Sequence, residues 1–373
     1  MAFTACGKQI SIDYDATTRI SLRVRCKLAL PRPSLSNWML TLPKRAKEEI
    51  PFLATFFLTS EIATSCDLGD FLFIAAATLG TAEATARRGE SKKRCDFRAA
   101  SVQSKTRYSV IFPGVFTKTD LHMKNFLRPF QLPEFLSGND SRVFHEGVQT
   151  RASFSIATPE VFDLSLRRRL DIRNPPNNTR KSHARVAVLR GSFRSWKYFH
   201  KYKALLDYQF VFNEQIYEQA VKNLLPLIRG KNNSTVLVGV HVSRQEASKP
   251  GLASYGYIPA DKRYFEHAFA SMNEKYASVA YFVVGDDLSW CRQAFANITD
   301  TTFVESVNSA VDLATLSLAD HLILSVGSLG WWAAYLSDAR DVIYYKHWPK
   351  PQSEMAQVYS HRDYFFPHWT AMD

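Results

Sequence analysis

A histidine, an arginine and a glutamate occur together in the segment HVSRQE, residues 241–246, which continues the apolar run VLVGV. Imidazole and guanidinium groups bind bases and phosphates, and a carboxylate accepts hydrogen bonds or protons, so this composition indicates a binding site. A single histidine in a buried strand is more often a core residue, and only the neighbouring Arg244 and Glu246 favour a ligand role for His241. Ser243 interrupts the charged residues, and its role needs an explanation.

A second candidate site is the glycine-containing segment SVGSLGWWAAYL, residues 325–336. Gly327 and Gly330 allow the backbone to approach a ligand, and Ser328 offers a hydroxyl. The helix expected after this turn presents unpaired N–H groups to an anion, so a phosphate fits. The spacing is neither G-x-G-x-x-G nor G-x-x-x-x-G-K-[ST], so dinucleotide and P-loop sites are not supported. The alternative is a strand-to-helix turn that needs glycine only for its geometry.

Two adjacent aspartates, Asp286 and Asp287, follow the apolar run VAYFVVG. They are either two metal ligands or a turn that caps the next helix, and capping is preferred for at least one of them. Adjacent aspartates differ from the D-x-D with which metal-dependent sugar-nucleotide enzymes hold their ion. A magnesium or manganese site is therefore the alternative at this position.

The elements that would position these residues are predicted from residue 235 onward. Short apolar runs alternate there with helical stretches, a pattern that requires parallel strands joined by crossovers. The pattern predicts a doubly wound, Rossmann-like α/β domain, in which ligands bind beyond the carboxyl ends of the strands. His241 to Glu246, the two aspartates and the glycine turn all fall there, so we expect one site. The expected strands are 236–242, 279–285, 301–306, 321–326 and 341–346.

The preceding part of the chain is less regular. Residues 68–90 show helical spacing, with a Gly-Asp pair near the start that offers a cap. The polar, proline-punctuated stretch 92–178 predicts short elements and long loops. A strand, a glycine turn and a helix are expected over 186–206, and a helical residue pattern continues through 207–228. The apolar stretch 50–62 falls short of the ~20 residues that a membrane span needs, and predicts a buried strand or helix.

Length and composition narrow the function classes. A chain of 373 residues suggests two domains, and a net charge of +12 favours an anionic partner. A nucleic-acid partner is disfavoured, because the sequence has no zinc-finger spacing and no sustained basic helix. The five cysteines form no C-x-x-C pair, so a zinc site is not expected and the redox compartment stays open.

Glycosylation motifs are more frequent than chance predicts. Five of the thirteen asparagines begin an N-x-S/T sequon, where about two are expected by chance, and this favours a secretory address. The N-terminus shows no apolar signal-peptide core. For a luminal protein, either the anchor lies outside this chain or the first sixty residues are not the native start. The sequons begin at Asn139, Asn177, Asn232, Asn233 and Asn297.

Four segments together resemble the galactoside α1,2-fucosyltransferases of glycosyltransferase family 11. LGDFLFIAAATLG is similar to the family's L-G-N-Q-x-F-x-Y-A-x-L-x-G, and LRGSFRSWKYF to its G-Y-F-Q-S-W-K-Y-F. VGVHVSRQE is similar to V-G-V-H-V-R-R-G-D, and residues 282–291 with 313–336 resemble the core of the family's donor domain. The resemblance covers residues 68–369. It implies a GT-B-like α/β fold of two lobes.

The resemblance also implies an activity and a domain plan. Such an enzyme transfers L-fucose from GDP-β-L-fucose to the 2-hydroxyl of a terminal galactose with inversion, without a metal or a further cofactor. Its partners are the donor and a galactose-terminated glycan, and its address is the Golgi membrane with a luminal catalytic domain. The expected division is an unassigned segment at 1–60, an acceptor-side lobe at 61–225 and a GDP-fucose-binding domain at 226–373.

Individual roles follow residue by residue from the same resemblance. His241 and Asp312 would hold guanine, and the turn would meet phosphate oxygens through Gly327, Ser328 and Gly330. Arg244 matches the second arginine of the H-x-R-R motif, and it is a catalytic candidate together with Glu246, a possible base. Ser243 falls at the donor site but replaces the first arginine, which resembles the main β-phosphate ligand of related enzymes.

These departures leave alternatives open. The loss of that arginine requires a substitute cation, for which Lys249, Arg194 and Lys197 are candidates, or implies a catalytically impaired, carbohydrate-binding relative. Asp70 also replaces the family's asparagine, which places a carboxylate near the expected pyrophosphate. A metal-dependent glycosyltransferase that uses Asp286 and Asp287 is the third alternative.

Overall fold

The computed structural model describes a defined part of the chain. The sequons at Asn139, Asn177, Asn232 and Asn233 lie outside it, as does most of 92–178 and nearly all of 1–60. The described ranges are 56–60, 67–86, 108–110, 151–155, 185–190, 193–210, 212, 214–228, 231, 234–249, 251–305, 308–337 and 339–373. None of the helices in these ranges is long and apolar enough to cross a membrane.

The C-terminal lobe is built on a six-stranded sheet in the order β10-β9-β8-β5-β6-β7, with every neighbouring pair parallel. The central strand β5 reads VLVGVHV and is almost entirely buried, as expected for a parallel sheet covered on both faces. The bounds are β5 Val236–Val242, β6 Val279–Gly285, β7 Thr301–Phe303, β8 His321–Leu324, β9 Val342–Tyr345 and β10 Thr370–Met372.

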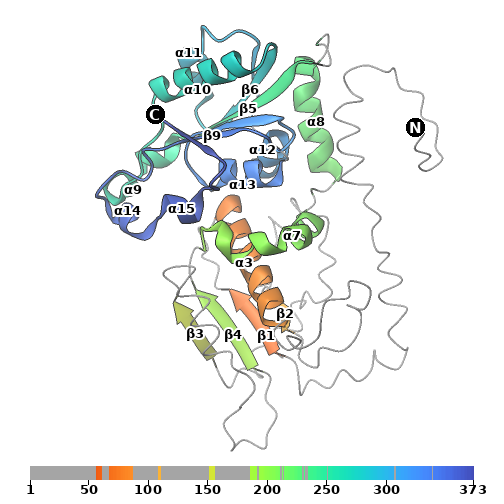
Figure 1. Ribbon diagram of the computed structural model, residues 1–373, viewed down its shortest axis with the longest axis vertical. Coiled ribbons are helices and arrows are strands. Elements are labelled where there is room, and N and C mark those ends of the chain that lie inside the picture. Colours follow the sequence, from red (N-terminus) through yellow and green to blue (C-terminus); the bar gives the residue numbers. More distant parts are fainter. Residues whose placement is uncertain are drawn as a thin grey trace, which may run out of the picture.

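Helices cover both faces of this sheet. α12 and α13 lie on one face and α10 on the other, and α8 packs against α12 (Figure 1). The doubly wound fold predicted from the sequence is therefore confirmed. The helix bounds are α8 Glu214–Ile228, α9 Leu252–Tyr255, α10 Lys262–Lys275, α11 Leu288–Ala294, α12 Ser309–Leu316, α13 Ser328–Leu336, α14 Glu354–Val358 and α15 His361–Tyr364, with a 3-10 turn η6 at Gln245–Ser248.

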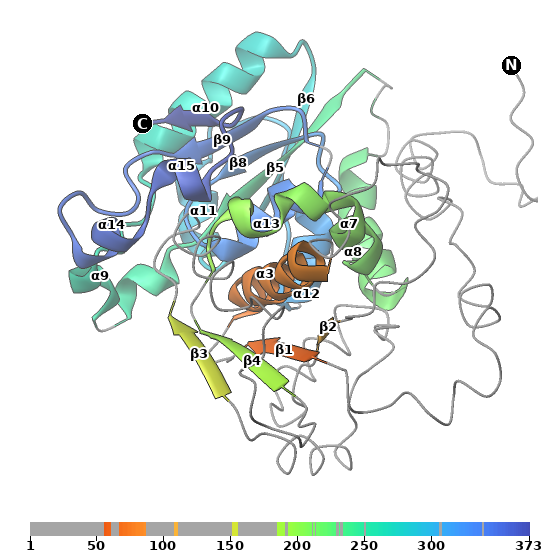
Figure 2. The same ribbon diagram turned by 60° about the horizontal axis from the view of Figure 1, so that its bottom comes forward.

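The first lobe contains a four-stranded parallel sheet in the order β2-β1-β4-β3. Its strands are β1 Phe56–Ser60, β2 Tyr108–Val110, β3 Arg151–Ser155 and β4 Arg185–Arg190. Two parallel-sheet lobes give the expected GT-B-like fold. Helix α3, Leu68–Ala86, lies between this sheet and the C-terminal lobe (Figure 2). The short elements η4 Trp196–Tyr198, η5 His200–Tyr202 and α7 Lys203–Gln209 follow β4.

The division at residues 225 and 226 stays a prediction. Helix α8 crosses that boundary and packs against α12 and β6 of the second sheet. Strand β1 lies at the end of the unassigned segment 1–60, within the apolar stretch 50–62 for which a strand or helix is predicted. The two observations bear on the domain boundaries predicted near residues 60 and 225.

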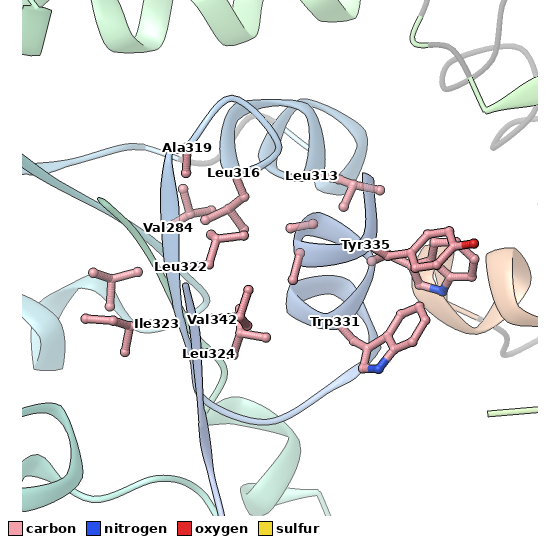
Figure 3. Packing of buried hydrophobic residues seen from close by; sticks show 14 of the residues in the cluster. Val284, Leu313, Leu316, Ala319, Leu322, Ile323, Leu324, Trp331, Tyr335 and Val342 are labelled. Atoms are coloured by element: carbon pink, nitrogen blue, oxygen red, sulfur yellow. The ribbon is translucent and has the colours of Figure 1, made fainter. Parts of the chain in front are cut away.

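Aromatic residues fill the contact between the lobes. Phe73 of α3 lies against Trp331 and Trp332 of α13, with ring centroids 4.6 and 5.1 Å away, and Phe199 stacks on Trp332. In Figure 3, Trp331 and Tyr335 point away from the sheet toward α3. A Cβ at Gly69 would lie 2.5 Å from the Ser328 hydroxyl oxygen, so only glycine permits this approach of α3 to α13. The beginnings of the two helices therefore lie in direct contact.

Several local predictions need correction. The cap of α3 is Asp67, whose Oδ1 accepts from the Asp70 backbone N–H at 2.7 Å, and not the Gly-Asp pair. The continuous helical pattern predicted over 207–228 is interrupted: α7 ends at its C-cap Phe210, and α8 begins at Glu214. Strand β10 was not predicted, because its three residues carry too short a pattern. Helix α13 begins at Ser328, so most of the expected glycine turn is its first turn.

Candidate donor site

The ends of three strands meet at one edge of the C-terminal sheet. The Asp286 N–H donates to the Val242 carbonyl at 3.2 Å, and the Ser325 N–H donates to the His241 carbonyl at 3.0 Å. The segments after β5, β6 and β8 are thus directly joined by hydrogen bonds. The single cluster expected at the carboxyl ends of the strands is present.

Asp286 organises the turn after β5. Its carboxylate accepts from the backbone N–H groups of Arg244 and Gln245 at 2.8 and 3.2 Å, and from the Ser243 hydroxyl at 3.1 Å. The Gln245 side-chain amide donates to the Asp286 carbonyl. Three hydrogen bonds to one carboxylate fix the backbone path of this turn. Asp286 is therefore engaged by its own chain.

Asp287 begins helix α11. Its carboxylate accepts from the Trp290 N–H at 3.0 Å, so the capping role predicted for one of the two aspartates is confirmed. In the part of the chain that the structure describes, no three histidine, cysteine or acidic residues are grouped so that they could hold a metal ion.

Arg244 is bound to protein groups. Its guanidinium lies 3.8 Å from the centre of the Trp290 ring and donates to the Ala260 carbonyl at 3.0 Å. A cation over a tryptophan face and a backbone carbonyl together hold the side chain in this orientation. The contacts fasten the turn after β5 to helix α11.

Ser243 lies beside the glycine turn. A Cβ at Gly327 would be 4.0 Å from the Ser243 hydroxyl oxygen and 3.7 Å from the Tyr257 hydroxyl oxygen. The Ser243 N–H donates to the Ser325 hydroxyl oxygen at 2.8 Å, which sets the serine against the end of β8. Gly327 has φ +102°, a conformation that strongly favours glycine.

The first turn of α13 is a potential anion-binding site. Its N-cap Gly327 provides no side chain to satisfy the first N–H groups. The Ser328 hydroxyl donates to Asp67 at 3.2 Å, so it faces the start of α3. A Cβ at Gly330 would lie 2.5 Å from His241 Nδ1, which brings the imidazole against this first turn. The positive end of the helix dipole favours an anion here.

His241 is almost fully buried, with 5% of its surface exposed. Burial away from water lowers the pKa of its imidazole to about 4, because the charged form loses its hydration. Its Nδ1 has no hydrogen-bond partner among the described residues. His241 is therefore a neutral side chain with a polar atom directed at α13.

The other predicted site residues are placed as follows. Asp312 is buried in the first turn of α12, which packs against α13 and β5. Glu246 lies in η6, and the structure describes its backbone position only. The role of each remains a prediction.

Carboxylate groups bind two of the candidate substitute cations, Arg194 and Lys197. Arg194 forms a two-point ion pair with Asp70, and Lys197 pairs with Asp363. Lys249 is exposed after η6. Sequence reasoning did not find Asp67, Tyr257 or Tyr359 at this site, since none lies in a motif and only the fold brings them there.

Comparison with known proteins identifies the family. The signature of glycosyl transferase family 11 matches residues 183–373, just over half of the chain. The chain belongs to this family, and the resemblance seen in the sequence is confirmed.

Individual relatives match over a similar region. Galactoside 2-alpha-L-fucosyltransferase Sec1 of Mus musculus is 27% identical over 182 residues, covering 48% of this chain and 49% of the relative. Galactoside alpha-(1,2)-fucosyltransferase 2 of Gorilla gorilla gorilla is 28% identical over 186 residues, covering 48% and 53%. The match thus spans about half the length of these relatives.

Among solved structures, fucosyltransferase NodZ from Bradyrhizobium aligns with a TM-score of 0.41 at 14% identity, covering 76% of this chain and 94% of NodZ. POFUT1 in complex with GDP aligns with a TM-score of 0.44 at 11% identity, covering 79% and 99%.

Proposed function

We propose that this protein is a galactoside α1,2-fucosyltransferase. It transfers L-fucose from GDP-β-L-fucose to the 2-hydroxyl of a terminal galactose, with inversion at the anomeric carbon and without a metal ion. Family membership and the names of the matched relatives support this reaction. The first turn of α13, with no side-chain cap beyond Gly327 and with His241 and Ser243 beside it, is the observation that carries it.

The chemistry accounts for that choice of site. The acceptor hydroxyl attacks the anomeric carbon of fucose while the bond from that carbon to the β-phosphate oxygen breaks, and GDP leaves with the electron pair. Negative charge develops on the phosphate, and backbone N–H groups at a helix start stabilise it without reorganising. His241 and Asp312 are assigned to guanine, and Glu246 is the candidate that accepts the acceptor proton.

Two observations favour a slow enzyme. The Ser243 hydroxyl is bonded to Asp286, and the Arg194 guanidinium is paired with Asp70, so neither replaces a phosphate-binding arginine. A charge-assisted hydrogen bond contributes about 1.5–3 kcal/mol, so its loss corresponds to a rate lower by about ten- to a hundredfold. A binding protein without turnover is the second candidate. Asp286 and Asp287 are both engaged by backbone groups, which disfavours the metal-dependent alternative.

Luminal residence in the Golgi belongs to the same proposal. The excess of sequons supports it, and Asn297, the sequon that the structure describes, is exposed in the turn after α11.

The test is a transfer assay. GDP-fucose is incubated with the protein in the presence and absence of lactose, and both GDP release and the fucosylated product are measured. Lactose-dependent release together with a 2-linked fucosyl product supports the proposal. GDP binding without any release identifies the binding protein instead, and absence of GDP binding removes both candidates.

A further inference from the structure

We propose that Asp70, Arg194 and Tyr359 form a binding site for sugar hydroxyls beside the phosphate site at the start of helix α13. This inference rests on the proposed reaction between GDP-fucose and a galactose acceptor, and it names side chains that would recognise a sugar in that reaction. Asp70 and Arg194 stand where the resembling family motifs have asparagine and glutamine, so these contacts are particular to this chain.

The three side chains come from both lobes. Asp70 lies in the first turn of α3 and Arg194 follows β4, whereas Tyr359 is the C-cap of α14 in the C-terminal lobe. The Arg194 guanidinium donates to both carboxylate oxygens of Asp70, and its Nη1 donates to the Tyr359 hydroxyl oxygen at 2.5 Å. One guanidinium thus holds a carboxylate and a phenol hydroxyl side by side where the lobes meet. Sites for small ligands are frequent at such boundaries.

Asp70 is connected to the first residue of α13 through Asp67. The Asp67 Oδ1 atom accepts from the Asp70 N–H at 2.7 Å and from the Ser328 hydroxyl at 3.2 Å. A Cβ at Gly69 would lie 2.5 Å from the same Ser328 hydroxyl oxygen. Because the sugar of GDP-fucose is bonded directly to the β-phosphate, residues next to the phosphate site are placed to meet a sugar.

The cluster has hydrogen-bonding groups to spare. A guanidinium has no acceptor atom, so the Tyr359 oxygen accepts from Arg194 and the tyrosine proton is directed elsewhere. That proton has no acceptor among the residues that the structure describes. Three of the five Arg194 N–H groups take part in the contacts above, and the Asp70 oxygens keep further lone pairs. Donors and acceptors therefore lie next to one another.

The charge balance of the cluster favours a sugar over a phosphate. The charges of Asp70 and Arg194 compensate each other, and burial raises the pKa of the Tyr359 hydroxyl, which stays neutral at neutral pH. A phosphate only accepts hydrogen bonds and is repelled by the carboxylate, whereas each sugar hydroxyl both donates and accepts. Neighbouring hydroxyls of fucose or galactose can donate to Asp70 and accept from Tyr359. The Asp70 and Arg194 side chains are 21% and 22% exposed, so a ligand can reach them.

Calorimetric titration of Tyr359→Phe tests this site with GDP, with GDP-fucose, and with lactose added to the GDP-saturated protein. The substitution removes one hydroxyl, changes no charge and keeps the ring beside the Arg194 guanidinium. GDP affinity should stay unchanged. GDP-fucose or lactose should bind about three- to tenfold more weakly, the usual value of one neutral hydrogen bond. A loss for GDP-fucose assigns the site to fucose, and a loss for lactose assigns it to galactose.

Tyr281→Phe is the matched control, because Tyr281 is buried in β6 and its hydroxyl donates to Asn273 on α10 at 2.8 Å. This variant should bind all three ligands as the unmodified protein does. Equal losses of GDP and GDP-fucose affinity in Tyr359→Phe, or unchanged binding of both GDP-fucose and lactose, overturn the inference while the proposed function stands. If the unmodified protein binds no GDP, the proposed function fails first and the inference fails with it.

Discussion

The Arg194 guanidinium and the Asp70 carboxylate form a two-point ion pair between the segment after β4 and the first turn of α3. Nε donates to Oδ1 at 2.6 Å, Nη2 donates to Oδ2, and Nη1 donates to the Tyr359 hydroxyl at 2.5 Å. Asp70 and Arg194 stand where the resembling family motifs have asparagine and glutamine. One departure from the family thus compensates the charge of the other, beside Gly69 and the start of α13.

Replacing Arg194 alone is expected to lower stability and GDP affinity more than replacing both Arg194 and Asp70. Arg194→Gln leaves the partly buried Asp70 carboxylate unpaired, so the free energy of unfolding should fall by about 1–3 kcal/mol, and GDP should bind more weakly to the more negative site. Adding Asp70→Asn should recover most of both losses. Urea unfolding and GDP titration of the four proteins measure the coupling.

The control for this double-variant comparison is the i,i+4 pair Lys262–Glu266, which is solvent-exposed on α10. Lys262→Gln should change the free energy of unfolding by only about 0.3–0.5 kcal/mol. A double variant of Asp70 and Arg194 that is no more stable than Arg194→Gln would contradict the compensation.

Ser243→Arg is expected to tighten GDP binding and raise transfer by at least about tenfold, equivalent to about 1.4 kcal/mol. The serine Cβ lies 4.0 Å from the Cβ position at Gly327, so a longer side chain begins next to the expected phosphate. His241→Ala and Asp312→Ala should weaken GDP binding both in the unmodified protein and in the Ser243→Arg variant. Gln293→Arg, which adds the same charge at an exposed position of α11, is the control. Weaker GDP binding by Ser243→Arg would show that another group already fills this place.

Stability should fall as the pH is lowered, in part through His241. Its pKa is lowered to about 4 by burial, so between the ordinary value of about 6.5 and 4 the unfolded chain binds a proton that the folded protein does not. His241 alone should remove about 2 kcal/mol of stability between about pH 7.5 and 5. His200 and His321 also have lowered pKa values through burial and act in the same direction.

The measurement is urea unfolding at both pH values for the unmodified protein and for His241→Gln. The variant cannot take up this proton, so its stability should depend less steeply on pH. Equal slopes for the two proteins would show that His241 binds its proton equally well in both states.

Chelation tests the metal-independent mechanism. Excess EDTA should leave fucosyl transfer unchanged, because Asp286 binds the turn after β5 and Asp287 caps α11. The assay is GDP-fucose with lactose, before and after chelation. Complete loss of transfer that manganese restores would establish a metal requirement, with Asp286 and Asp287 again the candidate metal ligands.

Asn297 is expected to carry an N-linked glycan when the chain is secreted from a eukaryotic cell behind a supplied signal sequence. Both Asn297 and Thr299 of its sequon are exposed after α11. Treatment with an N-glycan-removing enzyme should reduce the mass, and Thr299→Ala, which keeps the asparagine, should abolish the part due to this site. If the mass of the protein does not change on this treatment, none of the five sequons carries a glycan, and the main support for Golgi residence is removed.

The sequence alone determined the architecture of the C-terminal lobe. β5 and β6 have the bounds that their apolar runs predict, because seven-residue apolar runs between helical stretches are stable only as buried parallel strands. The positions of Asp286 and Gly327 at the carboxyl edge followed from the same topology. Short elements such as β10 escaped prediction because three residues carry no periodic pattern.

The tertiary structure decided which side chains remain available to a ligand. The sequence shows that Ser243 replaces an arginine and that Arg194 is a nearby candidate, but hydrogen bonds formed across long sequence separations assign each group its partner. Ser243 is bonded to Asp286, 43 residues away, and Arg194 is paired with Asp70, 124 residues away. Tyr257 lies beside the glycine turn only because the folded chain brings the ends of β5 and β8 together. No local sequence pattern predicts this contact.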